Sequence, residues 1–337
     1  MSSFLFPSPF LLLLLLLLSP PTSSYLPPPS ILQSLLSTPN KCHVMPCCYD
    51  GLTARLISGH PSSFNVTFMS GFGVAASLGY SDTQIVTAED MYRQSRVVCE
   101  ALVNARRRVT QPLTPTSPPL PCIADGDTGH GGRESVRRTV FSFGRAGMAG
   151  VMIEDQAAPK RCGHVDGKRV VGMEEAVERV RAAVRARDEF EQVTGLPGPR
   201  VLARTDARGS VDYKGGGGFE EAVKRTEAFR DAGADMLFLE SPRTVEEMRA
   251  WCDQVPGVPK LYNSLEGGKT PIVAPETLAE IGFSLAAYPL TMLSAGAKAQ
   301  ERALDRIAGG EDVNDLVLGF EDLKEKVRRW RGANATR

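Results

Sequence analysis

Eight short apolar runs recur along this chain, and longer segments with helical spacing separate them. The runs occupy residues 44–48, 65–69, 122–124, 151–153, 200–203, 236–239, 259–262 and 284–288. None alternates between apolar and polar residues, which is typical of parallel strands covered on both faces. Eight such units suit a barrel of ~250 residues. The sequence therefore predicts an α/β fold, a (β/α)₈ TIM barrel, with a doubly wound sheet as the alternative.

The intervening segments carry apolar residues at the period of an amphipathic helix. Apolar residues recur at helical spacing within 173–184 and again within 219–226, which predicts two helices that cover strands. The pair Gly309 and Gly310 is a helix-ending signal. Residues 311–330 are expected to form one more helix or two.

The first forty residues differ from the rest of the chain. They contain no Lys, Arg, Asp or Glu, and residues 11–18 are an unbroken leucine run followed by Ser/Pro-rich sequence. That run is too short to span a bilayer, so no stable membrane insertion is expected. We interpret residues 1–40 as a removable targeting or disordered segment. An organelle, chloroplast or mitochondrion, is the favoured destination, with the secretory pathway or cytoplasm as alternatives. The barrel is then expected at 41–310, with a C-terminal helical extension at 311–337.

The overall charge and the cysteines exclude several classes of protein. The 39 basic and 39 acidic residues balance, which argues against a nucleic-acid partner or an anionic membrane surface. The seven cysteines are odd in number and contain no C-x-x-C spacing. A zinc knuckle or a disulfide framework is therefore not expected, and a reducing compartment fits best.

Polar residues follow most of the apolar runs directly. They are Ser70, Asp125, Asp127, Glu154, Asp155, Arg204, Asp206, Glu240 and Asn263. Any one of them alone is most simply a helix cap or a turn residue. In a barrel, however, all of these strand ends meet at the C-terminal mouth, where active sites are built. Carboxylates without sulfur or imidazole partners suit a hard cation such as Mg²⁺.

Several of these positions lie in longer motifs that resemble the isocitrate lyase and phosphoenolpyruvate mutase superfamily. The motifs are S-G-F at 70–72, G-Y-S-D at 79–82, D-G-D-T-G-H-G at 125–131, I-E-D-Q at 153–156, P-K-R-C-G-H at 159–164, A-R-T-D-A at 203–207, A-G-A-D at 232–235 and N-S-L-E-G-G-K-T-P at 263–271. The resemblance covers roughly residues 44–323. The D-G-D and E-G-G-K-T-P variants are similar to the branch of petal death proteins and carboxyphosphonoenolpyruvate mutase-like proteins.

The resemblance implies a Mg²⁺ site, in which Mn²⁺ could replace Mg²⁺. Asp125 is expected to coordinate the ion, and Asp127 and Glu154 to hold it through water. This arrangement agrees with the chemistry of Mg²⁺, which keeps several waters and takes one or two direct carboxylates. The competing interpretation is that these carboxylates only cap helices.

The resemblance also implies a set of groups that bind a small carboxylate substrate. Backbone N–H groups of Ser70, Gly71 and Phe72 are expected to meet a substrate carboxylate, and Arg204 to bind substrate oxygens in a geometry that Lys cannot copy. The remaining substrate-binding residues implied are Asp82, Lys160, Glu240, Asn263 and Thr270. Without a ligand, the same residues would make a tight loop, a surface turn and structural ion pairs.

Cys162 is expected to be the general acid, on a loop that closes over the substrate. A lyase must protonate the carbanion left when the carbon–carbon bond breaks. We expect neighbouring cations, Lys160, Arg161 and His164, to lower the pKa of the Cys162 thiol. His164 is expected to orient the loop or to help bind a carboxylate. A cysteine alone is more often a small buried hydrophobic residue.

These residues together favour a Mg²⁺-dependent carbon–carbon lyase that acts on a 2-hydroxy or 2-oxo polycarboxylate of the 2-methylisocitrate or alkylmalate type. The alternatives are an oxaloacetate hydrolase, a phosphonopyruvate-type mutase and a catalytically silent binding barrel. Pro289 occupies a place where oxaloacetate-hydrolysing relatives tend to have Ser, which ranks lyase above hydrolase. The resemblance further implies a homotetramer, a dimer of dimers that exchanges C-terminal helices.

Overall fold

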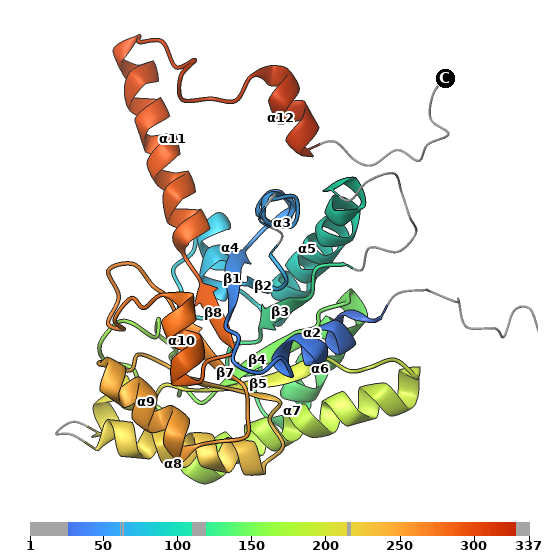
Figure 1. Ribbon diagram of the computed structural model, residues 1–337, viewed down its shortest axis with the longest axis vertical. Helices are drawn as coiled ribbons and strands as arrows, with labels where there is room; N and C mark the ends of the chain where they lie inside the picture. The colour runs from blue at the N-terminus through green and yellow to red at the C-terminus, as the bar shows by residue number, and fades with distance from the viewer. Residues whose placement is uncertain (1–25, 61, 63, 110–118, 214–216, 328–337) are drawn as a thin grey trace, which may run out of the picture.

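The computed structural model confirms the barrel (Figure 1). It describes residues 26–60, 62, 64–109, 119–213 and 217–327. Eight parallel strands close in chain order, with β8 paired to β1 through His43 and Leu285. The strands are β1 (His43–Cys48), β2 (Thr67–Met69), β3 (Cys122–Asp125), β4 (Gly150–Glu154), β5 (Arg200–Thr205), β6 (Met236–Leu239), β7 (Lys260–Asn263) and β8 (Leu285–Tyr288). Closure in this order excludes the doubly wound sheet.

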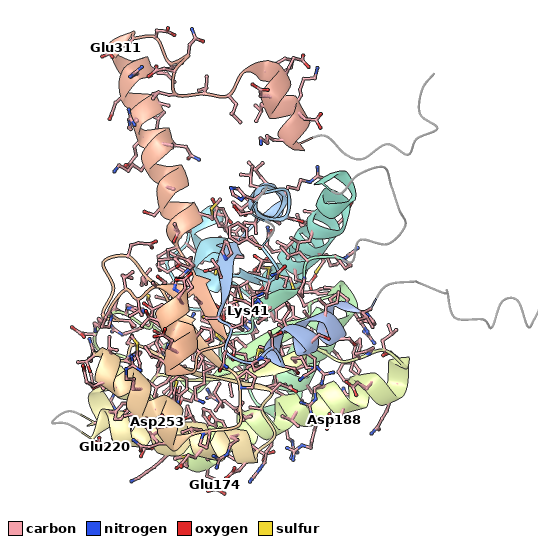
Figure 2. The ribbon with its side chains drawn as sticks, in the orientation of Figure 1. Lys41, Glu174, Asp188, Glu220, Asp253 and Glu311 are labelled. Carbon is pink, nitrogen blue, oxygen red and sulfur yellow. The ribbon has the colours of Figure 1, made fainter. Side chains whose placement is uncertain are left out.

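Helices surround the strands, as the apolar spacing predicts. They are α3 (Gly51–Ser58), α4 (Gly71–Ser77), α5 (Ala88–Val109), α6 (Arg133–Ala146), α7 (Met173–Thr194), α8 (Gly218–Asp231), α9 (Val245–Gln254) and α10 (Pro275–Ile281), with 3₁₀ turns η1 (Ala207–Gly209) and η2 (Val211–Tyr213). Charged side chains such as Glu174 and Asp253 project outward from them (Figure 2).

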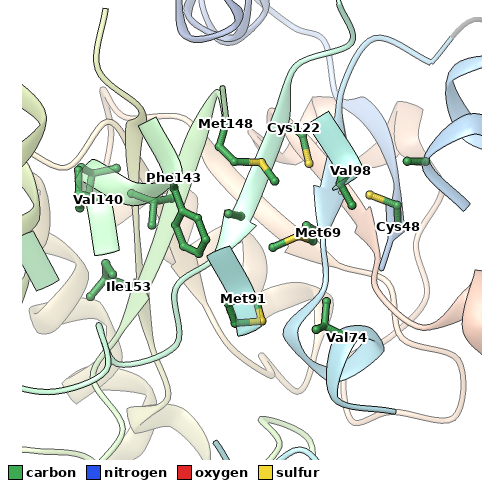
Figure 3. Close-up of a cluster of buried hydrophobic side chains, with 14 of the residues drawn as sticks. Cys48, Met69, Val74, Met91, Val98, Cys122, Val140, Phe143, Met148 and Ile153 are labelled. Carbon is green, nitrogen blue, oxygen red and sulfur yellow. The ribbon is translucent and has the colours of Figure 1, made fainter. Parts of the chain in front are cut away.

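A large apolar cluster lies between the strands and the helix layer. Cys122 of β3 and Met69 of β2 pack against Val98 of α5 and Phe143 of α6, and each of these residues is buried (Figure 3). Burial of this kind stabilises by roughly 1.5–3 kcal/mol for each large side chain. The layer holds the strands, and therefore the residues at their ends, in fixed positions.

One helix that the sequence did not predict packs against the interior of the barrel. Helix α2 (Pro28–Leu36) buries Leu32 completely in one cluster with Met45 and Ile123 of the barrel interior. The domain boundary expected near residue 41 is therefore wrong, because residues 28–36 are part of the folded core. Residues 1–25, which include the leucine run of the expected targeting segment, lie outside the described residues.

The C-terminal part forms an arm. Helix α11 (Thr291–Gly309) leads away from the barrel to α12 (Phe320–Val327) (Figure 1). Gly310, with φ +68°, ends α11 as its glycine signal predicts. No residue of α11 is buried within the described part of the chain, and Leu304 and Ile307 are both exposed. The arm thus presents an apolar surface. Among the helices that the structure describes, none combines the length and apolar character needed to cross a membrane.

Candidate active site

Strand geometry alone brings the polar residues into the barrel mouth. An apolar side chain inside the barrel precedes each strand-end residue by two positions, and side chains two apart on a strand point to the same side. The pairs are Phe68 and Ser70, Ile123 and Asp125, Met152 and Glu154, Leu202 and Arg204, Phe238 and Glu240, Leu261 and Asn263, and Ala287 and Pro289. The alternation that packs the interior therefore also aims these residues at one point.

All of these strand-end residues except Glu154 line a small cavity of about 70 Å³ at the mouth. Ten of the predicted site residues line it, namely Ser70, Phe72, Asp82, Asp125, Lys160, Cys162, His164, Arg204, Glu240 and Asn263. Apolar side chains of Leu261, Leu265 and Leu290 form another part of its wall. The predicted residues thus come together, although they are far apart in the sequence.

Four predicted site residues do not line this cavity. Gly71 directs its backbone N–H to Oδ2 of Asp125 at 3.0 Å. The hydroxyl of Thr270 is buried and has no hydrogen-bond partner among the residues that the structure describes. Asp127 and Glu154 lie beneath the cavity wall, fully or almost fully buried. Gly71 therefore orients a carboxylate of the site.

Asp125 is the central carboxylate of the expected metal site. Its Oδ1 accepts a hydrogen bond from the backbone N–H of Asp127 at 3.0 Å. Burial, followed by the nearby charge of Asp127, raises the pKa of Asp125 to about 6. A negative charge here is unfavourable unless a cation is near.

The buried carboxylate of Glu154 is a second site that favours a nearby positive charge. Neither of its buried oxygens accepts a hydrogen bond from any described residue, and Nη1 of Arg204 lies 3.4 Å from Oε2. Burial raises the pKa of Glu154 well above its usual value, although Arg204 and Lys160 oppose the shift. A carboxylate left without hydrogen bonds in the interior is costly, so the residues present fit a hard divalent cation.

Few protein ligands would contact such a cation directly. No three His, Cys, Asp or Glu side chains of the described ranges converge closely enough to hold an ion by themselves. Mg²⁺ commonly keeps several waters and takes one or two carboxylates. The geometry therefore suits an ion held partly through water. Lys160, whose ammonium pairs with Asp127 and lies 2.7 Å from Asp82, supplies positive charge beside it.

Cys162 reaches the cavity, but its predicted acidity is wrong. Burial raises the pKa of the thiol above its ordinary value, and the charges of Asp82 and Glu240 add to this, while the backbone N–H of His164 and the charge of Arg204 lower it. Two of the cations that were expected to lower this pKa, those of Lys160 and Arg161, lie in other surroundings. The ammonium of Lys160 is engaged by two aspartates, and Arg161 is exposed. The thiol therefore stays protonated at neutral pH, as a general acid must be.

His164 links the loop of Cys162 to the strand ends. Its Nε2 lies 3.0 Å from Oε1 of Glu240 and 3.3 Å from Nδ2 of Asn263. Its Nδ1 accepts the backbone N–H of Lys269 at 3.0 Å. Arg204 and His164, after burial is accounted for, lower the pKa of Glu240, so that carboxylate is ionised. His164 therefore joins its loop to the ends of β6 and β7.

Arg204 carries the positive charge at the centre of the cavity. Asp206 holds it with two hydrogen bonds, from Nε at 2.9 Å and from Nη2 at 3.1 Å. Nη2 also lies 3.2 Å from Glu240, and the guanidinium sits 5.2 Å from the ring centre of Phe238. These contacts fix the orientation of the planar guanidinium at the wall of the cavity.

Two residues behind the cavity escaped the sequence analysis. Lys168 is fully buried beside Asp206, and Ser241 donates to the carbonyl of Gly163 at 3.2 Å. Lys168 follows a glycine in a polar loop and carries no periodic signal. The only feature of the sequence that pointed to Lys168 was its closeness to the glycine of the K-R-C-G-H run.

Comparison with known proteins finds one matching family and several similar enzymes. The sequence profile of the family described as phosphoenolpyruvate phosphomutase matches residues 32–308. The 2,3-dimethylmalate lyase of Eubacterium barkeri is 34% identical, over 90% of this chain and 97% of that protein. The petal death protein of Dianthus caryophyllus is 36% identical, over 85% of this chain and 86% of that protein. Oxaloacetate acetylhydrolase, solved with 3,3-difluorooxalacetate, superposes with a TM-score of 0.77 at 32% identity, covering 90% and 94% of the two chains.

Proposed function

The chain belongs to the isocitrate lyase and phosphoenolpyruvate mutase superfamily, and from this premise we propose that it is a carbon–carbon lyase acting on a 2-hydroxy or 2-oxo polycarboxylate of the 2-methylisocitrate or alkylmalate type. The observation that carries the proposal is that the half-buried Cys162 thiol and the guanidinium of Arg204 line one cavity. A proton donor for the carbanion and a cation that binds a carboxylate are two of the groups that such a cleavage requires.

The residues of the chain divide the work of a retro-aldol cleavage. Arg204, with Asn263, binds and orients substrate oxygens. The hydroxyl proton passes to a carboxylate at the cavity, for which Glu240 is available, as the hydroxyl-bearing carbon becomes a carbonyl. The electron pair of the broken bond passes to the leaving carbon, and Cys162 protonates that carbon. His164 and Glu240 hold the loop, which excludes water from the carbanion.

We propose Mg²⁺, or Mn²⁺ in its place, as the cofactor, held by Asp125, Asp127 and Glu154. When bound, the ion supplies positive charge that stabilises the oxygen on which negative charge develops. The buried carboxylates with raised pKa values support this assignment.

Two other reactions are open to the same cavity. Oxaloacetate hydrolysis is supported by the similarity to oxaloacetate acetylhydrolase, but Pro289 lines the cavity and offers no hydroxyl. A phosphonomutase would share the barrel and metal, yet it has no need of a thiol acid. We therefore rank the lyase first.

The deciding experiment is a screen of the purified enzyme with Mg²⁺ against 2-methylisocitrate, isocitrate, 2-alkylmalates, oxaloacetate and phosphonopyruvate. The lyase proposal expects the highest kcat/KM on one of the first three. Highest turnover of oxaloacetate or phosphonopyruvate would replace it with the hydrolase or the mutase. No turnover, together with no binding of Mg²⁺, would support a silent binding barrel.

We also propose a homotetramer, a dimer of dimers in which the C-terminal arm packs on a neighbouring subunit. The arm exposes Leu304, Ile307 and Phe320. An apolar cavity of about 660 Å³, lined in part by Ile57 and Met292, lies beside the base of α11. Sedimentation of the full chain and of a form ending at residue 310 tests this, because only the full chain should form the tetramer.

The N-terminal segment is proposed to direct the protein to an organelle. The composition of residues 1–25 supports this. Import into isolated chloroplasts or mitochondria, followed by N-terminal sequencing, would identify the destination and the cleavage site.

A further inference from the structure

The loop that carries Cys162, residues 157–169 (the acid loop), is closed at its base by backbone pairing. Gln156 forms an antiparallel bridge with Val170, and the Ala157 N–H donates to the carbonyl of Arg169 at 2.9 Å. The side-chain amide of Gln156 also holds the backbone of Arg161 with bonds of 2.9 and 3.0 Å. The base is therefore fixed, and the position of the thiol depends on what holds the tip.

Several side chains tie the tip to the barrel, among them those of His164 and Ser241, and one of these ties is the buried ammonium of Lys168. Nζ of Lys168 donates to the carbonyl of Gly163, the residue after Cys162, at 2.6 Å, and to Oδ1 of Asp206 at 2.7 Å. The side chains of Lys168 and Asp206 are both completely buried. Ser241 donates to the same Gly163 carbonyl at 3.2 Å.

The packing around this ammonium leaves little room for movement. A Cβ atom at position 163 would collide with Nη2 of Arg204 and with Glu240. A Cβ at position 209 would lie 2.8 Å from Cε of Lys168. The acid loop therefore rests directly on the substrate-binding guanidinium, and Asp206 bonds to both that guanidinium and Lys168.

We propose that Lys168 is a positioning residue for the reaction, which holds the Cys162 thiol in register with Arg204 by joining the Gly163 carbonyl to Asp206. It touches no substrate, because it does not line the cavity. The idea rests on the proposed role of Cys162, but its structural part, closure of the acid loop, can be measured without any substrate.

The competing explanation is that Lys168 only neutralises the buried charge of Asp206. Both explanations predict a less stable Lys168→Met variant, since removing one partner leaves a buried charge. The two explanations differ in the exposure that they predict for the Cys162 thiol. If Lys168 holds the tip, its loss hydrates and exposes Cys162, whereas a mere counter-ion leaves Cys162 as protected as before.

The experiment compares Lys168→Met with Arg169→Met in the full-length protein. Arg169 is the next residue on the same loop, and its ion pair with Asp212 is exposed, so this control removes a cation without touching the tether. Iodoacetamide labelling at pH 8, with mass mapping, reports Cys162 against the six other cysteines. Hydrogen exchange reports the backbone at 160–167.

We expect Lys168→Met to label Cys162 at least tenfold faster than wild type and to lower kcat at least tenfold, with a smaller change in KM. Arg169→Met should stay within about twofold in both. Equal labelling rates in the two variants would overturn the proposal.

If Lys168→Met does not fold, Ser241→Ala removes the other donor to Gly163 without changing charge. It should then speed labelling two- to threefold, and no change would refute the tether. Failure of the proposed function would instead appear as absent turnover with the labelling result intact.

Discussion

The backbone N–H of Lys269 donates a hydrogen bond to Nδ1 of His164 over 3.0 Å, while Nε2 of the same ring faces Oε1 of Glu240 at 3.0 Å. Because Nδ1 accepts, it carries no proton, and the proton of a neutral ring is on Nε2. His164 therefore joins the acid loop to the loop after β7 and, at the same time, donates to a buried carboxylate.

These two contacts can be separated by substitution. The carbonyl of His164→Asn can take the place of Nδ1, and the amide nitrogen of His164→Gln can take the place of Nε2. A bond to a charged group is worth about 1.5–3 kcal/mol and a neutral one about 0.5–1.5 kcal/mol. We therefore expect His164→Asn, which loses the Glu240 contact, to lower kcat/KM more than His164→Gln. Steady-state kinetics measure this, and equal losses would show that one contact carries no weight.

Chelation tests the carboxylate cluster. EDTA should abolish activity, and Mg²⁺ or Mn²⁺ should restore it, because burial raises the pKa values of Asp125 and Glu154, whose ionised forms a cation would stabilise. Asp125→Ala should lose Mn²⁺ binding, measured by electron paramagnetic resonance, while its circular dichroism stays that of the wild type. Full activity in EDTA would remove the basis for a metal cofactor.

The pKa of Asp125 gives metal binding a direction with pH. The folded value of about 6 lies above the ordinary value of 3.8, so the folded, metal-free state binds this proton more tightly than the unfolded chain does. The contribution of Asp125 to stability is then greatest below pH 4 and is lost as the pH rises through 6, by roughly 3 kcal/mol. A cation binds only the deprotonated form.

We therefore expect Mg²⁺ to raise the Tm of the protein more at pH 7.5 than at pH 5. Differential scanning calorimetry with and without Mg²⁺ at each pH measures the shift. Asp125→Ala is the control and should show none. A shift of the same size at both values would mean that protons and the ion do not compete at this carboxylate.

The sequence predicted the barrel from its eight short apolar runs, and it predicted the residues that line the cavity from the strand ends and the superfamily motifs. The strand-end residues, such as Ser70 and Asn263, lie two positions beyond side chains of the barrel interior. Their inward direction therefore follows from the two-residue period of each strand. Lys168 and α2 could not be predicted in this way. The role of Lys168 depends on contacts with Gly163 and Asp206 across the fold, and α2 is recognisable only once Leu32 is seen in the barrel interior. The pKa of Cys162 was mispredicted for the same reason, since burial is a property of the folded chain.

Position 289 should influence which substrate is cleaved. Pro289 lines the cavity next to Leu290 and has no hydroxyl to bind a hydrated oxaloacetate. We expect the wild type to hydrolyse oxaloacetate poorly and Pro289→Ser to raise kcat/KM for it about five- to tenfold, the effect of one hydrogen bond of ~1 kcal/mol. Pro289→Ala is the control that removes the ring without adding a hydroxyl. An efficient wild-type oxaloacetate hydrolase would reverse our ranking of the two reactions.

The last prediction concerns the acid itself. Cys162→Ser keeps the side chain small but replaces a thiol with a hydroxyl, which is a far weaker acid than a group of reference pKa about 8.5. General acid catalysis contributes about 10²–10⁴-fold, so kcat on the best substrate should fall by that order. KM should change little, because Arg204 and its partners do the binding.

A control separates this effect from the loss of any thiol. Cys252 is buried on α9, away from the cavity, and Cys252→Ser should keep the wild-type kcat. Bound substrate should also protect Cys162 from iodoacetamide, because the closed loop covers it, and mass mapping would show the protection at that residue. If Cys162→Ser turns over its substrate at nearly the wild-type rate, the thiol is not the acid. The acid loop would then serve only to exclude water, and the lyase would lose its main advantage over the mutase.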